Sequence, residues 1–92
     1  MYGKIQKEVR AGVPKRIKEL RIIKGYSQPK MAEELFISLS TYRKIEAGEK
    51  LLSMNQLLSL IQIFGINFNE FVRPLIKEIG DKRKRNNKDT QN

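Results

Sequence analysis

Apolar residues recur along most of the chain at spacings of three and four, the pattern of helices that bury one face. This pattern predicts five helices, at about 14–24, 28–35, 39–47 and 54–64, with a fifth that begins after Asn67. The segment 54–64 has the broadest apolar face, so we expect it to be the central helix. No strand pattern of any length competes, and the predicted fold class is all-α.

Residues that end and begin helices stand between these segments. Four glycines each follow a helical stretch, where a left-handed residue commonly ends a helix; they are Gly25, Gly48, Gly65 and Gly80. Side chains that cap helix starts come next, at Ser27, Ser38, Ser53 and Asn67. Ser53 with Gln56 forms a capping-box pattern, and Asn67 with Glu70 resembles one.

Two prolines refine the helix boundaries. Pro14 suits the first position of helix one, where its missing N–H does no harm. Pro74 falls inside the fifth helix, where it removes a hydrogen bond, so we expect a kink or a fresh start. Apolar side chains on the segment that follows are Leu75, Ile76 and Ile79.

The two ends of the chain are read separately. Residues 1–12 allow two structures: one helical turn through Ile5 and Val9 against the body, or a loose basic arm. The stretch 81–92 has no apolar residue and predicts a flexible basic tail. We therefore divide the chain into an N-terminal segment at 1–12, a helical domain at 13–73, a helical extension at 74–80 and the tail at 81–92.

Composition narrows the class of protein. The chain has 92 residues and a net charge of +9, from 19 Lys and Arg against 10 Asp and Glu. This charge suggests nucleic acid as partner, or less often an anionic membrane surface. The chain has no Cys and no His, which excludes disulfides, thiolate or imidazole metal sites, a Ser-His triad and a Cys nucleophile. No paired-carboxylate pattern occurs, so we expect neither an enzyme nor a cofactor.

No run of about 18 apolar residues exists that could span a bilayer. The N-terminus carries charges and lacks the apolar stretch of a signal peptide. We therefore expect no membrane partner and a cytoplasmic protein.

The segment from Ser27 to Glu46 is the most informative part of the chain. It consists of two short helices joined by a tight turn and is followed by Ala47 and Gly48. This is the layout of a helix-turn-helix, in which the second helix is carried into the DNA major groove.

From Ile17 to Val72 the sequence resembles the lambda-repressor-like (Cro/C1, XRE-type) helix-turn-helix domain. The resemblance spans many positions: Leu20, Ser27, Gln28, Met31, Ala32, Leu35, Tyr42, Ile45, Glu46, Gly48, Met54, Leu57, Leu60, Ile61, Phe64, Gly65, Ile66 and Phe71. It implies an all-α, five-helix lambda-repressor-like DNA-binding domain, here with a short C-terminal helical extension and a flexible basic tail.

The sequence departs from the family pattern at three positions. Phe36 stands in the turn where the family usually has Gly or Asn, so it must adopt a positive φ or the turn must differ. Ile61 occupies a position that is mostly Ala, which predicts looser or shifted packing. Leu39 replaces a residue that is polar in several members.

The resemblance also implies which residues bind DNA. Gln28 would donate to a phosphate and brace the recognition helix, and the N-termini of helices two and three would offer N–H groups to phosphates. The predicted DNA-binding residues are Gln28, Ser38, Leu39, Ser40, Thr41, Arg43 and Lys44. Arg43 and Lys44 can reach guanine O6 and N7, whereas Leu39 can pack only on a thymine methyl.

Each assignment has a structural alternative. Arg43 and Lys44 can form an ordinary solvated helix face, and Gln28 can be only a helix-start residue. Leu39 can pack within the domain or in an interface, and Tyr42 is expected in the core rather than on DNA.

The predicted function is a sequence-specific regulator of transcription that binds double-stranded DNA as a homodimer, most simply a repressor. Apolar side chains after Pro74, with Phe68 or Val72, would form the dimer contact or else fold back on helix one or the N-terminal segment. The alternative function is a protein-interaction module or an antitoxin on the same fold, which binds a partner protein.

Overall fold

The structure, a computed structural model, describes the backbone of residues 2–77 and the side chains of residues 11–77. Its helices are α1 (Tyr2–Lys24), α2 (Gln28–Glu34), α3 (Leu39–Glu46) and α4 (Met54–Phe64). Residues 68–77 form one more helix, the C-terminal helix. The described part of the chain contains no strand, and the predicted all-α fold is confirmed.

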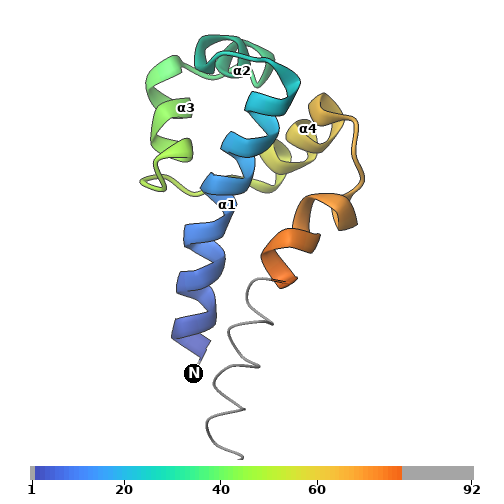
Figure 1. Cartoon of the computed structure of the whole chain (residues 1–92). Helices are drawn as coiled ribbons and strands as arrows, with labels where there is room; N and C mark the ends of the chain where they lie inside the picture. The colour runs from blue at the N-terminus through green and yellow to red at the C-terminus, as the bar shows by residue number, and fades with distance from the viewer. Residues whose placement is uncertain (1, 78–92) are drawn as a thin grey trace, which may run out of the picture.

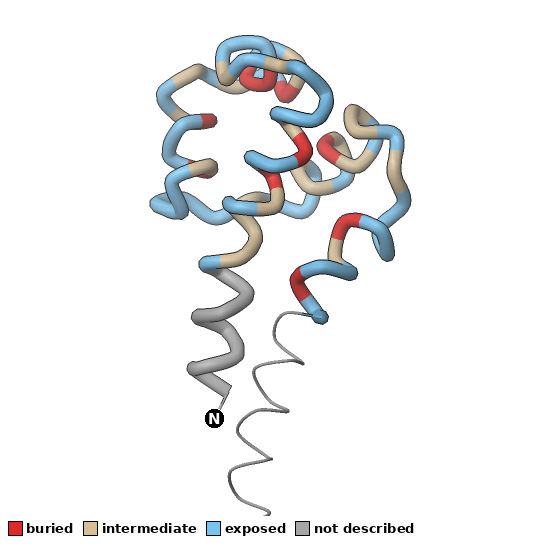
Figure 2. The backbone as a smooth tube through the Cα atoms, in the orientation of Figure 1, coloured by how far each residue is buried: buried red, intermediate tan, exposed pale blue. Residues whose placement is uncertain are grey.

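The helices are arranged around α1. In Figure 1, α2 and α3 lie on one side of its C-terminal half, and α4 and the C-terminal helix lie on the other. The buried residues, drawn red along the backbone tube in Figure 2, lie where these helices face one another. They are Ile17, Leu20, Met31, Ala32, Leu35, Tyr42, Ile45, Leu60, Phe71 and Leu75. Within residues 2–77, no helix has the length and apolarity needed to cross a membrane.

The predicted caps are confirmed where the structure describes them. Ser27, Ser38 and Ser53 each accept a hydrogen bond from a backbone N–H in the first turn of the following helix. The Ser53 and Gln56 capping box is complete in both directions. Asn67 Oδ1 accepts from the Glu70 N–H at 2.8 Å, which caps the C-terminal helix.

The glycines at helix ends behave as predicted. Gly25, Gly48 and Gly65 have φ values of +79°, +81° and +67°, the left-handed conformation that ends a helix at little cost for glycine. Gly80 lies outside the described residues.

The predicted start of helix one is wrong. α1 begins at Tyr2 and passes through Pro14, so residues 2–12 continue the helix instead of forming a loose arm. The reason is that residues before Pro14 pack against another helix. A Cβ added to Gly12 would come within 2.6 Å of Leu75 Cδ2, so this part of α1 lies directly against the C-terminal helix (Figure 1).

Pro74 does not interrupt the C-terminal helix, which is helical from 68 through 77. A helical N–H at position 74 would bond the carbonyl of Glu70, and proline has none to offer. Arg16 supplies a donor for that carbonyl. Its Nη2 donates to the Glu70 carbonyl at 2.8 Å, and its Nε donates to the Phe71 carbonyl at 3.0 Å. A side chain of α1 thus stabilises the helix across its proline.

Leu75 is buried against α1, which agrees with the predicted alternative that apolar side chains after Pro74 fold back on helix one, while Ile76 is exposed and Val72 half-buried. Ile79 and the tail at 81–92 lie outside the described residues. α4 is not the central helix, because only Leu60 of its side chains is fully buried, while α1 lies between α3 and α4 and packs against both.

Candidate nucleic-acid interface

The start of α3 is fixed by two hydroxyl groups. Ser38 has extended backbone angles, and its Oγ accepts a hydrogen bond from the Thr41 N–H at 3.0 Å. The same Oγ donates to Thr41 Oγ1 at 2.9 Å. Both side chains predicted to meet DNA therefore serve the cap, which leaves lone pairs on their oxygens for a further donor.

The body of α3 has two distinct faces. Tyr42 and Ile45 are buried in the core, while Ser40, Arg43 and Lys44 are exposed. Leu39 is half-buried. Its side chain is therefore neither fully packed within the domain nor fully available to DNA, the two roles that the sequence predicted. The exposed face therefore carries one hydroxyl and two cations at helical spacing, a set that matches phosphate oxygens and guanine edges.

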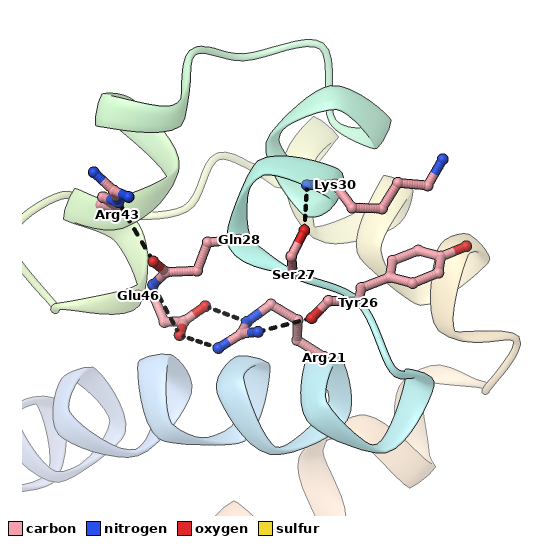
Figure 3. A network of polar contacts seen from close by, with 7 residues as sticks. All are labelled: Arg21, Tyr26, Ser27, Gln28, Lys30, Arg43 and Glu46. Carbon is pink, nitrogen blue, oxygen red and sulfur yellow. Dashed lines mark hydrogen bonds and ion pairs between the residues drawn. The ribbon is translucent and has the colours of Figure 1, made fainter.

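A network of polar side chains fastens α3 to the rest of the domain (Figure 3). Arg21 of α1 pairs with Glu46 through two parallel contacts, Nε to Oε2 and Nη2 to Oε1, both at 3.0 Å. Arg21 Nη1 also donates to the Tyr26 carbonyl at 2.8 Å. A bidentate pair of this kind fixes orientation as well as distance.

Gln28 extends this network to the exposed face of α3. Its Nε2 donates to Glu46 Oε1 at 3.3 Å, and its Oε1 accepts from Arg43 Nε at 3.4 Å (Figure 3). The predicted bracing by Gln28 is thus present in the geometry. Arg43 is held at its base while its Nη groups stay free of protein partners among the described residues.

The charges of the network are set by burial and pairing. Burial is the largest single influence on Glu46 and opposes its charged form, but the hydrogen bonds and the charge of Arg21, together with the hydrogen bond from Gln28, outweigh it and lower the pKa of Glu46. The hydrogen bond to Glu46 raises the pKa of Arg21 in turn. Burial, followed by the nearby Glu46, raises the pKa of the Tyr42 hydroxyl. That hydroxyl lies beside the pair without meeting hydrogen-bond geometry.

The start of α2 adds further positive charge near Gln28. Ser27 caps it by accepting from the Lys30 N–H at 3.2 Å. The ammonium groups of Lys24 and Lys30 lie 5.7 Å and 5.8 Å from the centre of the Tyr26 ring, close enough for cation–π attraction. Lys30 also pairs with Glu34 at 2.9 Å. Neighbouring side chains therefore restrict the positions of the Lys24 and Lys30 ammonium groups.

The turn between α2 and α3 contains the departure noted at Phe36. Its φ is +56°, the positive value that the sequence allowed as one of two outcomes, and its side chain is 95% exposed. It is the one non-glycine residue with positive φ in the described chain. The turn therefore has a positive φ at the position where the family usually has Gly or Asn, and this conformation strains the backbone of Phe36.

Two contacts between residues far apart in the sequence were not predicted. Arg21 and Glu46 lie 25 residues apart, and Arg16 lies 55 from Phe71, so no local spacing signals either pair.

Within residues 11–77, no group of three or more acidic side chains is placed to hold a metal ion. The arrangement offers hydrogen-bond donors and positive charge on one exposed helix.

Comparison with known families matches residues 15–73 to the family described as "Helix-turn-helix domain". The match covers more than half of the chain, and the protein belongs to this family. The resemblance to the Cro/C1 type is confirmed by it, and DNA binding is the general function that the family supports. No curated protein and no solved structure matches the chain.

Proposed function

We propose that this protein is a sequence-specific regulator of transcription that inserts α3 into the major groove of double-stranded DNA. The observation that carries the proposal is the position of Arg43. It is exposed on the outer face of α3, yet Gln28 accepts from its Nε, and Gln28 itself donates to the half-buried Glu46. A cation that is ordered before binding loses less conformational entropy when it meets a base.

The contacts divide into two kinds. Arg43 and Lys44 are proposed to read base edges, and Ser40 to bond a base edge or a phosphate. Leu39 is proposed to pack on a thymine methyl with the part of its side chain that stays exposed. Thr41 and Gln28 are proposed to position the helix by donating to phosphates, because the Thr41 hydroxyl and the second Nε2 hydrogen of Gln28 are still available as donors. Ser38 donates its hydroxyl to Thr41, so it is proposed to act near a phosphate through the helix start that it caps.

The strong positive charge supports this assignment. A net charge of +9 raises the rate of encounter with DNA and supplies affinity that does not depend on sequence. A small domain seated on its operator acts most simply by blocking access of polymerase, so repression is the proposed sign of regulation. The proposed compartment is the cytoplasm, where such a regulator meets its DNA.

We propose that two copies act together. Recognition helices of a twofold dimer meet DNA about one turn apart, roughly 34 Å. With only two cationic side chains reading bases on each α3, a single copy has few contacts that discriminate. A dimer doubles this footprint and therefore the discrimination.

Selection from random duplexes, at several salt concentrations, tests the proposal. The expected result is a recurrent half-site whose selection depends on Arg43 and Lys44, with affinity that falls linearly on a logarithmic scale with salt. Weak binding that disappears at physiological salt, with no selected sequence, would favour the interaction module or antitoxin instead.

A further inference from the structure

An open cavity of about 590 Å³ lies between α1 and the end of α3, within the range of volumes that ligand sites occupy. Its lining combines charged side chains with small or apolar residues: Pro14, Lys15 and Lys18 of α1, and Glu46, Ala47 and Gly48 at the end of α3. A Cβ added to Gly48 would lie 3.6 Å from Pro14 Cγ, so the chain that leaves α3 packs on α1 beside this cavity. The two helices therefore hold its walls in place.

The charge of the cavity is positive. Lys15 and Lys18 are exposed and lie three residues apart, on one face of α1. Neither takes part in an ion pair within residues 11–77. The carboxylate of Glu46 already accepts from Arg21 through both of its oxygens, each at 3.0 Å. Two ammonium groups thus line a cavity whose carboxylate is already paired, a combination that suits an oxyanion such as phosphate.

The cavity lies at one end of the exposed face of α3. Ala47, which lines it, is the C-cap of α3 and follows Arg43 by four residues, about one helical turn. The eight residues of α3 span about 12 Å, roughly the width of the DNA major groove. Residues just beyond its two ends therefore come within reach of the two phosphate backbones that border the groove. The phosphate contacts proposed for Gln28 and Thr41 lie at helix starts and serve one backbone, which leaves the other to the cavity.

The end of α3 needs added positive charge before it can approach a phosphate. A helix carries about half a negative charge at its C-terminus, and Glu49 follows in the exposed loop, where Lys50 offsets it. Lys15 and Lys18 bring two positive charges to the same end. Their sum exceeds the helix dipole, so this end of α3 attracts a phosphate where the helix alone would repel it.

We propose that Lys15 and Lys18 bind a phosphate group in this cavity, and that the group belongs to the DNA backbone opposite the one met by the starts of α2 and α3. The proposal rests on the proposed function, because α3 must enter the groove to bring this phosphate to the cavity. A free phosphate ion offers the same oxyanion chemistry, and the experiment separates the two sources.

The first arm compares Lys15→Gln/Lys18→Gln with the wild type on the duplex obtained by selection, at several salt concentrations. Each neutralised phosphate contributes about 0.9 to the slope of log affinity against log salt. We expect the slope of the variant to be smaller by about 1–2, with similar losses of affinity on the selected and a scrambled duplex. Arg73→Gln/Lys77→Gln removes two exposed charges from the C-terminal helix and is the matched control, with a nearly unchanged slope. Circular dichroism checks that both variants fold.

The second arm locates the phosphate. Uncharged methylphosphonate replaces the backbone phosphates of the selected duplex one at a time. We expect the wild type to lose affinity at one position or two adjacent positions where Lys15→Gln/Lys18→Gln loses none. A variant with the wild-type slope and the wild-type sensitivity at every position overturns the site, even where Arg43-dependent selection stands.

The third arm titrates inorganic phosphate into the DNA-free protein at constant ionic strength and follows the backbone amide of Gly48 by NMR. A saturable shift that the variant lacks, with no effect of the variant on DNA, would contradict the DNA backbone and assign the cavity to free phosphate. The same shift in a protein that selects no DNA sequence leaves the phosphate site intact and contradicts the regulator. Failure of the site and failure of the proposed function therefore give different results.

Discussion

Arg21 and Glu46 join α1 to the end of α3 through two N–O contacts of 3.0 Å each. Their side chains are only 12% and 5% exposed, so the pair is largely shielded from solvent, although neither residue is fully buried. It holds α3 from the inside while Arg43 and Lys44 remain on the outside. The pair therefore helps the apolar core to orient the exposed face of α3, which we propose to read DNA.

Removing one partner of this pair should be costly. Glu46→Ala leaves the largely shielded Arg21 charge without its carboxylate, and we expect a loss of about 2 kcal/mol in the free energy of unfolding. Urea denaturation measures it. Arg21→Met/Glu46→Met, which removes both charges, serves as the control and should recover much of the loss. Equal destabilisation by the single and double variants would contradict a buried-charge penalty.

Acid should weaken the fold through the same residue. The pKa of Glu46 is lower in the folded chain than its ordinary value of 4.5, so the unfolded chain binds the proton more readily. Its contribution to stability is therefore complete well above pH 4.5 and is lost as the pH falls through the lowered pKa. Urea denaturation of Glu46→Gln between pH 7 and pH 3, roughly the range in which carboxylates titrate, should show a shallower decline than the wild type. An unchanged slope would remove Glu46 as the cause.

Phe36 should be a position where the native residue destabilises the fold. A side chain with a Cβ costs about 1–2 kcal/mol in the left-handed region, and a ring that is 95% exposed returns little through burial. We expect Phe36→Gly to raise the free energy of unfolding by about 0.5–1 kcal/mol, after the larger entropy of glycine in the unfolded chain is subtracted. Phe36→Ala keeps the Cβ and is the matched control. If Ala stabilises as much as Gly, strain is not the reason.

Arg16 and Pro74 should be coupled. Arg16→Met removes the protein donor of the exposed Glu70 carbonyl, and water replaces it in part, so we expect a cost of about 1–1.5 kcal/mol. Pro74→Ala restores a backbone N–H for that carbonyl, so the cost of Arg16→Met should fall by about 1 kcal/mol in this background. Thermal denaturation of the four proteins of the cycle gives the coupling free energy. A coupling near zero would mean that Arg16 does not compensate for the proline.

What the sequence could predict was local. Spacing of apolar residues and serine caps placed α2, α3 and α4 within a residue or so, because a cap and the helix it starts are neighbours in sequence. The extent of α1 could not be predicted, since Pro14 is a good helix start and only the packing of Gly12 on Leu75 carries the helix past it.

In the candidate site, too, local features could be predicted from the sequence and a long-range contact could not. Its exposed residues follow from helical spacing within α3, which identifies Ser40, Arg43 and Lys44. The pairing of Arg21 with Glu46 joins two helices across the fold and has no local signal. Apolar spacing also overestimated the burial of α4, because the sequence does not say whether a partner covers an apolar face.

The most direct test of the central claim is the effect of Arg43→Gln on binding to the selected duplex and to a scrambled duplex of equal length. If α3 reads DNA, affinity for the selected site should fall by roughly 10- to 100-fold, equivalent to about 1–3 kcal/mol, while affinity for the scrambled duplex falls far less. Lys77→Gln, which removes an exposed charge from the C-terminal helix, is the matched control and should preserve the preference. Equal losses on both duplexes, or an undiminished preference in Arg43→Gln, would contradict the reading of sequence by α3.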